Sequence, residues 1–406
     1  MGKKVIVIAL IIIALTVILA LVFRSEIGRL QYQTSLFTGA PQHENFDRQD
    51  EFYPVNRMAA STTPFSFPSG PPLTLPETFS HDDNRLDVAE FLTTTDTAAL
   101  LILQDGKLVY ENYFLNGGPS VAWLTHSISK SLVATAVAFT LQDGLLASLE
   151  DKASAYLPTL AGSGYAEVTV KQLLQMSSGV RWNEDYADRE SDLNQFGVTI
   201  LTGASYDEFV TTVQGEREPG SYHRYTGMDS QVLSMLVRAI TRQTLAAYLH
   251  GKLWQPLGMQ DEAYWSTDRH HAELGLGGLS ASARDLAKVG ELYRRRGRWG
   301  EEQILNPQFV EAATTVTNPL LIRGDHPQSA HRMGYGYHWW LPDGDAQDYA
   351  AIGIYNQFIY VNPQYRAVIV KLSAYRDYAN LESDMPYPEA PTFSLFRHIT
   401  VNLPAY

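Results

Sequence analysis

A serine and a lysine three residues apart, Ser127 and Lys130, open a segment that carries no further charge until Asp143. The intervening residues are apolar or small and suit a buried helix that ends near Gly144. Residues i and i+3 share one face of a helix, so the Lys130 amine can reach the Ser127 hydroxyl. We interpret the pair as a nucleophile and its base, and the rest of the chain must fold around that buried pair.

The start of a helix favours the neutral form of a lysine. A cation in the first turn opposes the helix macrodipole at a cost of roughly 0.3 to 1 kcal/mol, and burial disfavours the charge further. The backbone N–H of Ser127 belongs to the unpaired donors of the helix start, which can help to hold an oxyanion. Ser-x-x-Lys is expected about once by chance in such a chain. No other lysine here has serine three residues before it.

Composition excludes several classes of function. The net charge of -13 argues against a nucleic-acid partner, and the longest basic run is only Arg294-Arg295-Arg296. The absence of cysteine excludes disulfides, thiolate metal sites and a cysteine nucleophile. No Gly-x-Ser-x-Gly, His-Glu-x-x-His, Walker or dinucleotide motif occurs, and the adjacent His270 and His271 would point to different helix faces. We predict no cofactor and no metal, and leave the oligomeric state open.

Residues 5–23 form an apolar run without a charge, long enough to cross a bilayer. The run lacks a good small-x-small cleavage site, which favours an uncleaved anchor over a signal peptide. Lys3 and Lys4 precede it and only Arg24 follows, so the positive-inside rule places the N-terminus in the cytoplasm. We predict a single-pass anchor over residues 1–24, with the remaining chain outside the cytoplasm, in a bacterial periplasm.

The remaining chain divides into an arm and a catalytic domain. Residues 25–85 are polar and proline-punctuated, and are predicted to form an extended arm or linker. The domain spans residues 86–406. A hairpin is expected around Asp105-Gly106, and a mostly helical region over residues 150–275. A capping-box-like start at Ser282 opens a further helix to about residue 296.

Strands are predicted at both ends of this domain. Those of the first hairpin cover residues 98–103 and 108–110, and later ones cover residues 335–341, 349–354, 358–361 and 367–372. Strands on either side of a helical region suggest an α/β (α+β) fold. In this fold an antiparallel sheet flanked by helices is interrupted by an all-helical lobe, with the site at their junction.

The arrangement resembles the serine β-lactamase and penicillin-binding-protein superfamily, in its class C-like branch. Within that branch it is most similar to 6-aminohexanoate-oligomer hydrolases and related esterases, and the similarity covers roughly residues 85–400. Five segments carry it: residues 126–131 (HSISKS), 219–225 (PGSYHRY), 253–259 (LWQPLGM), 277–286 (GGLSASARDL) and 353–357 (GIYNQ). The resemblance implies the fold predicted above.

The resemblance also implies roles for residues of two further motifs. Tyr225 matches the tyrosine of a Tyr-x-Asn motif, whose phenol works with the lysine, but Gly227 stands where many relatives carry asparagine. The third motif, Lys-Thr-Gly in β-lactamases, is replaced by residues 351–353 (AIG), without the cation. Gly353 would let a substrate approach the strand, and the N–H of Ile354 would be a second oxyanion donor beside that of Ser127.

Three further residues are predicted to contact the substrate. Tyr186 lies in residues 183–186 (NEDY), which resemble a loop that covers the site in nylon-oligomer hydrolases. Asn356 and Gln357 would face the site if the strand register holds. For all three residues a purely structural role remains an alternative.

These observations predict a serine hydrolase that acts on a small-molecule ester or linear amide through an acyl-enzyme on Ser127, with Lys130 and Tyr225 as base and acid. Because the second motif lacks its asparagine and the third lacks its lysine, β-lactamase and D,D-peptidase activity rank below hydrolysis of an ester or linear amide. These two losses also leave open a non-catalytic or slowly deacylating, penicillin-binding-like sensor. Transacylation to an alcohol or amine would use the same residues.

Overall fold

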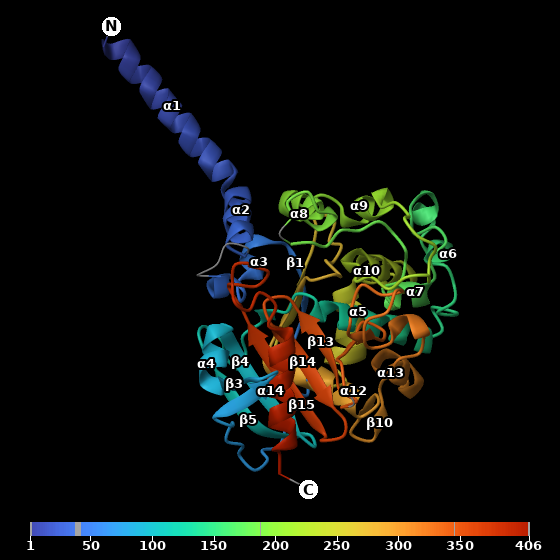
Figure 1. The fold of residues 1–406 in the computed structure, drawn as a ribbon. Coiled ribbons are helices and arrows are strands. Elements are labelled where there is room, and N and C mark those ends of the chain that lie inside the picture. The colour runs from blue at the N-terminus through green and yellow to red at the C-terminus, as the bar shows by residue number, and fades with distance from the viewer. Residues whose placement is uncertain (1, 37–41, 187, 345, 405–406) are drawn as a thin grey trace.

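A seven-stranded antiparallel sheet lies at the centre of the computed structural model, which describes residues 2–36, 42–186, 188–344 and 346–404. Its strand order is β11-β12-β13-β14-β15-β4-β5, so strands from the two ends of the sequence meet where β15 pairs with β4 (Figure 1). The bounds are β4 Thr97–Gln104, β5 Lys107–Tyr113, β11 Gly334–Tyr335, β12 Trp340–Leu341, β13 Tyr349–Gly353, β14 Gln357–Asn362 and β15 Ala367–Ser373.

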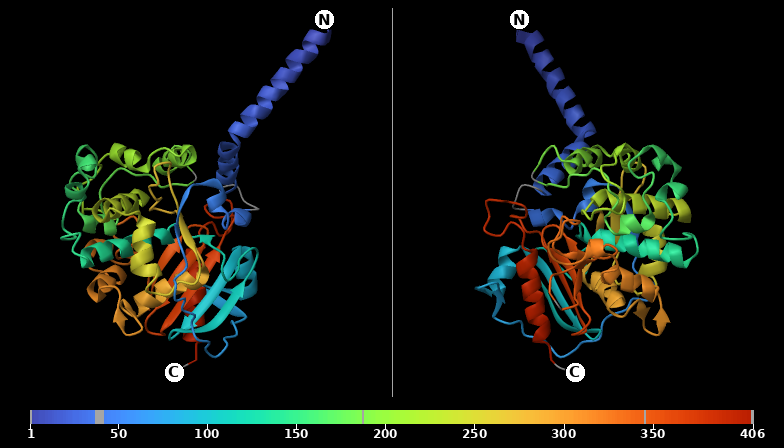
Figure 2. Two further views of the ribbon diagram at one scale, coloured as in Figure 1. Left: turned by 180° about the vertical axis from the view of Figure 1, so that it is seen from behind. Right: turned by 45° about the vertical axis from the view of Figure 1, so that its right-hand side comes forward.

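Helices cover both faces of this sheet. On one face lie α5 (Ile128–Gln142) and α12 (Ala283–Arg294), and on the other lies α14 (Glu389–Val401) (Figure 2). Side chains of β4 alternate between these two layers: Leu101 packs toward the first and Ile102 toward the second. Because both faces are buried, the central strands are continuous apolar runs rather than alternating ones. The predicted antiparallel sheet flanked by helices is confirmed.

The helical lobe lies between the two groups of strands, as predicted. Its longest helix, α10, packs against α5, which is buried from Ile128 to Thr140. The predicted helix at Ser282 is α12, whose N-cap side chain accepts a hydrogen bond from the N–H of Asp285. The helices of the lobe are α6 Ala153–Tyr156, α7 Val170–Leu174, α8 Asp192–Thr202, α9 Tyr206–Thr212, α10 Gly227–Thr241 and α11 Leu245–Leu249.

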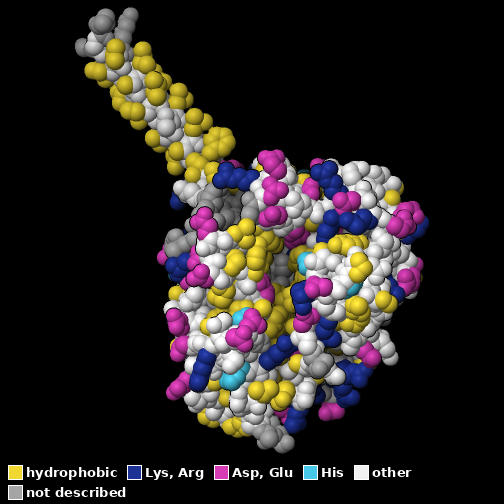
Figure 3. All heavy atoms as spheres, viewed as in Figure 1, with side chains coloured by type: hydrophobic (Ala, Val, Ile, Leu, Met, Phe, Trp, Pro, Cys, Tyr) yellow, Lys and Arg dark blue, Asp and Glu magenta, His cyan; other side chains and the backbone are white. Residues whose placement is uncertain are grey.

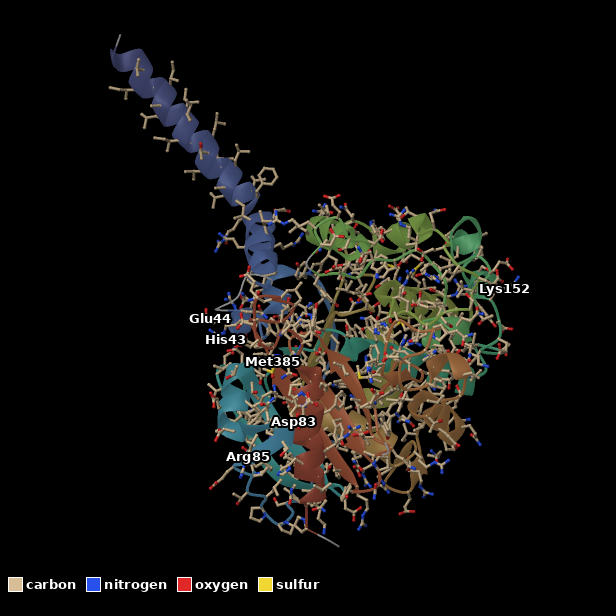
Figure 4. All side chains as sticks on the ribbon, in the orientation of Figure 1. His43, Glu44, Asp83, Arg85, Lys152 and Met385 are labelled. Atoms are coloured by element: carbon tan, nitrogen blue, oxygen red, sulfur yellow. The ribbon has the colours of Figure 1, made fainter. Side chains whose placement is uncertain are left out.

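The predicted extended arm is wrong for much of residues 25–58. Residues 24–36 form helix α2 (Arg24–Leu36), and α3 (Gln49–Phe52) follows. Phe46 is fully buried and contacts the rings of Trp123 and Tyr355. Composition suggested an extended arm or linker, but Phe46 and Tyr53 of this segment belong to the main core. In Figure 4, His43 and Glu44 of this segment lie at the opposite edge of the molecule from Lys152 in the helical lobe.

A second, four-stranded sheet connects this arm to the start of α5. Its order is β1-β7-β8-β6, and β6 ends three residues before Ser127. Each neighbouring pair is antiparallel. The bounds are β1 Val55–Met58, β6 Trp123–Leu124, β7 Ala263–Ser266 and β8 Leu279–Ala281. The arm is therefore built into the layer that holds the loop before Ser127.

The single strand predicted for residues 335–341 is instead two short strands, β11 and β12, joined by a tight turn. The Gly336 N–H donates to the Trp339 carbonyl across the turn, and His338 adopts a left-handed φ of 59°. The Ser131 hydroxyl of α5 donates to the His338 carbonyl at 2.6 Å. This tertiary contact, which no local pattern encodes, holds the turn against α5.

Helix α1 (Gly2–Val22) projects from the body, and its surface is largely hydrophobic (Figure 3). Residues Val5–Val22 have a mean hydropathy of 3.5, and none of them is buried. The helix is long and apolar enough to cross a membrane, and its length and position fit an anchor and a signal sequence alike. Backbone hydrogen bonds at Phe23 and Ile27 carry the helical path on into α2.

Candidate active site

Ser127 occupies the N-cap of α5 and is half-buried. The residue before it, His126, has a left-handed φ of 49°, so the chain turns sharply from β6 into the helix. The N–H and the hydroxyl of Thr125 both donate to the Leu279 carbonyl at 2.9 Å. These bonds tie the loop to β8 and fix the position of the Ser127 hydroxyl.

Lys130 lies one turn into α5 and is 2% exposed. Its Nζ donates to Ser127 Oγ at 2.8 Å and to the Leu276 carbonyl at 2.6 Å. Burial lowers the pKa of Lys130 to about 8, although the negative charge of Glu184 raises it in part. The spacing had predicted that this amine reaches this hydroxyl, and the structure brings the two together.

Tyr225 lies two residues before α10 and lines the larger cavity together with Ser127. The centre of its ring is 5.0 Å from Lys130 Nζ. Burial and the charge of Glu184 hold the pKa of Tyr225 well above its ordinary value, while a hydrogen bond with Ser127 acts to lower it. The ring stacks on Trp340, with centroids 5.4 Å apart. The two predicted proton carriers thus both lie beside the predicted nucleophile.

The end of β13 packs against the loop before Ser127. A Cβ on Gly353 would lie 2.4 Å from the Thr125 carbonyl oxygen and 3.4 Å from Ser127 N. Glycine is therefore required here for contact between two backbone segments, and its predicted role in the approach of a substrate stays a prediction. Ile354 follows directly, is half-buried and lines the cavities around Ser127.

Glu184 is a site residue that the sequence interpretation missed. Its Oε2 accepts hydrogen bonds from Trp182 Nε1 at 2.8 Å and from the Gly227 N–H at 2.5 Å. A Cβ on Gly227 would lie 3.0 Å from each carboxylate oxygen. The carboxylate therefore occupies the space beside the residue where relatives carry asparagine. The unusual glycine and the acid of the covering loop were both visible in the sequence, but their contact was not.

Of the three predicted substrate contacts, only Tyr186 lines the cavities. Asn356 and Gln357 are fully buried and line neither cavity at Ser127, so the expectation that they face the site is wrong. Tyr355 and Asn356 both have left-handed φ values, 68° and 69°, which make a tight turn between β13 and β14. With this turn, the side-chain Oδ1 of Asn356 accepts a hydrogen bond from the Thr392 hydroxyl on α14, at 2.9 Å.

Two cavities meet at Ser127, and both are also lined by Glu184, Tyr186 and Ile354. The smaller has a volume of about 390 Å³ and mostly aliphatic walls. The larger, of about 700 Å³, has aromatic walls that include Tyr225 and Trp340. Figure 3 shows a hollow on this face of the molecule, with hydrophobic side chains around it. In the described ranges no three His, Asp or Glu side chains are grouped to hold a metal ion.

Comparison with known proteins identifies the family to which this chain is similar. The family model described as Beta-lactamase matches residues 88–387. A 6-aminohexanoate-dimer hydrolase of Paenarthrobacter ureafaciens is 29% identical over 299 residues, which are 72% of this chain and 76% of that protein.

Solved structures share the fold. A Bacillus anthracis protein assigned as a 6-aminohexanoate-dimer hydrolase superposes with a TM-score of 0.78 at 23% identity, covering 90% of this chain and 94% of that one. A hydrolase with promiscuous acyltransferase activity gives a TM-score of 0.58 at 16% identity, covering 77% and 96% of the respective chains.

Proposed function

Because the chain belongs to the beta-lactamase family of hydrolases, we propose that it cleaves an ester or linear amide through an acyl-enzyme formed on Ser127. One observation carries the proposal: a buried lysine amine, with its pKa lowered to about 8, lies 2.8 Å from the hydroxyl of a half-buried serine. A neutral amine can accept the hydroxyl proton and so activate the serine. The name of the Paenarthrobacter relative points to the same bond class.

Acylation then proceeds with Lys130 and Tyr225 as proton carriers. As the Ser127 proton passes to Lys130, with Tyr225 as relay, Oγ bonds to the substrate carbonyl carbon. The bond from that carbon to the leaving oxygen or nitrogen breaks, and Tyr225 gives the leaving group a proton. Water next adds to the acyl carbon, the bond to Oγ breaks, and the serine regains its proton. Because the two carriers interact, they titrate as a pair.

The backbone N–H groups of Ser127 and Ile354 are the proposed oxyanion donors. Close packing of Gly353 against Thr125 brings these two segments together. One such donor typically contributes about 2.7 to 4 kcal/mol to the transition state. The donors belong to the backbone, so they are positioned by the junction of β13 with α5.

A β-lactam is a poorer fit than an ester or linear amide. The strand that would supply a lysine for a β-lactam carboxylate carries Ala351 and Ile352 instead. The carboxylate of Glu184, held at Gly227, adds a negative charge that would repel the carboxylate of the drug. The penicillin-binding alternative therefore ranks below the hydrolase.

We also propose that residues 1–24 anchor the chain in a membrane and that residues 25–85 are an arm that docks onto a catalytic domain of residues 86–406. The flanking lysines predict an extracytoplasmic location, in a bacterial periplasm. Helix α2 packs against α8 and α3, which supports a docked arm. Both cavities that meet at Ser127 are lined by residues of the proposed catalytic domain, and the smaller one is also lined by Leu30, Gln49 and Tyr53 of the arm.

The substrate class is tested with the full chain in phospholipid nanodiscs. Turnover of nitrophenyl acetate is expected to exceed that of a chromogenic cephalosporin, and Ser127→Ala is expected to lower kcat by at least about 10³-fold. Equal turnover of the two compounds would contradict the substrate assignment. A stable acyl adduct without turnover would instead support the binding-protein alternative.

A further inference from the structure

The smaller cavity at Ser127 is lined mainly by aliphatic side chains. Leu193, Val198, Ile200 and Leu201 come from α8, and Leu274 and Leu276 from the chain before β8. Residues 193, 197, 200 and 201 share one face of α8, so this helix presents a largely apolar wall to the cavity, with Asn194 as its polar member. The volume of about 390 Å³ falls in the usual range for ligand pockets.

Helix α2, which continues from the apolar α1, forms part of the wall of this cavity. Leu30 of α2 lines it and is 51% exposed, and Val198 of α8 lines it and is 56% exposed. These two side chains therefore form an apolar mouth between α2 and α8. Figure 1 shows α2 and α8 next to each other at the end of the body from which α1 projects, and α2 contacts α8.

The position of α2 is fixed by polar contacts with the domain. Arg29 Nε donates to the Phe52 carbonyl at 2.7 Å, and Glu26 lies 4.0 Å from the guanidinium of Arg269. A helix held in this way keeps Leu30 at the mouth. If α1 crosses a bilayer, the mouth opens close to the membrane surface.

Tyr225 indicates which part of a substrate enters the cavity. It lines the larger cavity and is absent from the walls of the smaller one. In the mechanism proposed above, Tyr225 protonates the leaving group, so the leaving group lies in the larger cavity. The acyl portion must then extend from Ser127 into the smaller, aliphatic cavity.

We propose that the smaller cavity binds the aliphatic acyl chain of a membrane-dissolved ester or amide, which enters between α2 and α8. The inference rests on the proposed acyl-enzyme function and specifies its substrate class. Each methylene that enters the cavity removes apolar surface from water and is expected to raise kcat/KM about fourfold until the cavity is full. Chain length, rather than a charged group, is thus the main determinant of acyl specificity.

The test measures kcat/KM of the full chain in phospholipid nanodiscs for nitrophenyl acetate, butyrate and octanoate. Wild-type protein is expected to prefer octanoate over acetate by at least 10-fold. Leu30→Asp places a charge at the mouth and is expected to lower this preference about 10-fold, and Val198→Asp is expected to act in the same way. Leu145→Asp, at another partly exposed leucine that lines neither cavity at Ser127, is the matched control and leaves the preference unchanged.

A second experiment determines whether the substrate enters from the membrane or from the solvent. A dioctanoyl glycerol ester dissolved in the nanodisc is expected to be cleaved by wild-type protein and about 10-fold more slowly by Leu30→Asp. Cleavage only of soluble octanoyl esters would overturn entry from the bilayer, and equal rates for all acyl lengths would overturn the acyl pocket. A wild-type chain that cleaves no ester and whose Ser127 fails to react with a fluorophosphonate would contradict the proposed function itself.

Discussion

The two cavities that share Ser127 differ in the chemistry of their walls. The nonpolar walls of the smaller cavity are mainly leucine, isoleucine and valine side chains, whereas those of the larger include Trp182, Tyr225, Trp340 and other aromatic residues; both cavities also have polar residues in their lining. Aliphatic walls select for size and flexibility, while aromatic rings favour flat or polarised groups and hold them in defined orientations. In the proposed mechanism, the acyl portion and the leaving group of the substrate therefore contact walls of different chemistry.

Their walls also differ in the contacts between the lining residues. In the larger cavity Tyr225 stacks on Trp340, and the Tyr378 hydroxyl donates to Glu389 at 2.7 Å. Burial raises the pKa of that Glu389 carboxyl. The smaller cavity depends on α2 and α8, two helices with exposed apolar residues at the mouth. The walls of the larger cavity are thus joined by aromatic stacking and a partly buried hydrogen bond, whereas the mouth of the smaller cavity is apolar.

The largest effect is expected from Tyr225→Phe, which removes the proposed proton donor from the larger cavity. General acid catalysis typically contributes 10²- to 10⁴-fold, so kcat for an anilide is expected to fall by about that factor. Nitrophenolate departs without protonation, so the fall for a nitrophenyl ester should be smaller. An equal loss for the two substrates would remove Tyr225 from leaving-group protonation.

A smaller effect is expected from Tyr387→Ala, at the rim of the larger cavity. The side chain is 50% exposed, so the substitution should not disturb the core. Loss of one aromatic contact is expected to lower kcat/KM for every nitrophenyl ester about 2- to 10-fold. The dependence on acyl length should stay as in the wild type, in contrast to Leu30→Asp. Tyr222→Ala, whose ring lies against Arg217, is the control. A changed acyl-length dependence would show that the two cavities are not independent.

The smallest effect is expected on the pH dependence of kcat/KM when Glu184, which lines both cavities, is replaced. The pKa of Lys130 is about 8 and only the neutral amine is a base, so kcat/KM is expected to rise with pH through that region. Glu184→Gln removes a negative charge that raises the pKa of Lys130, so the rising limb should move to lower pH by less than about one unit. Exposed Glu190→Gln should not move it.

A shift of the rising limb to higher pH in Glu184→Gln would contradict this effect of Glu184 on Lys130.

The pH dependence of stability is a second test of the pKa of Lys130. Its folded pKa of about 8 lies below the ordinary 10.5, so between these values only the unfolded chain binds the proton. The free energy of unfolding should therefore rise with pH in this window, apart from the effects of other groups, and Lys130→Met should reduce that rise.

The contact between Ser127 and Lys130 could be predicted from the sequence because their spacing is local. Ser127 and Lys130 are related by one helical turn, and the structure brings their side chains together. The cavity walls could not be predicted in this way. Leu30 comes from a segment that composition assigned to a linker, and the acid of the covering loop meets Gly227 only through the tertiary fold.

Turns produced the other errors. Asn356 was expected to face the site, but left-handed backbone at residues 355 and 356 directs its side chain to α14. The strand predicted for residues 335–341 was divided by a turn that α5 holds through Ser131. In both places a contact with a distant element determines the conformation. The period of hydrophobic residues and the strand propensity of the segment could therefore not predict it alone.

The most direct test of the central claim is the intact mass of the full chain after exposure to a fluorophosphonate probe, beside a Ser127→Ala control. The account predicts a single adduct on the wild-type protein and none on the control, since Ser127 alone is activated by Lys130. No adduct on folded wild-type protein, or an equal adduct on the control, would contradict an activated Ser127 and with it the acyl-enzyme mechanism.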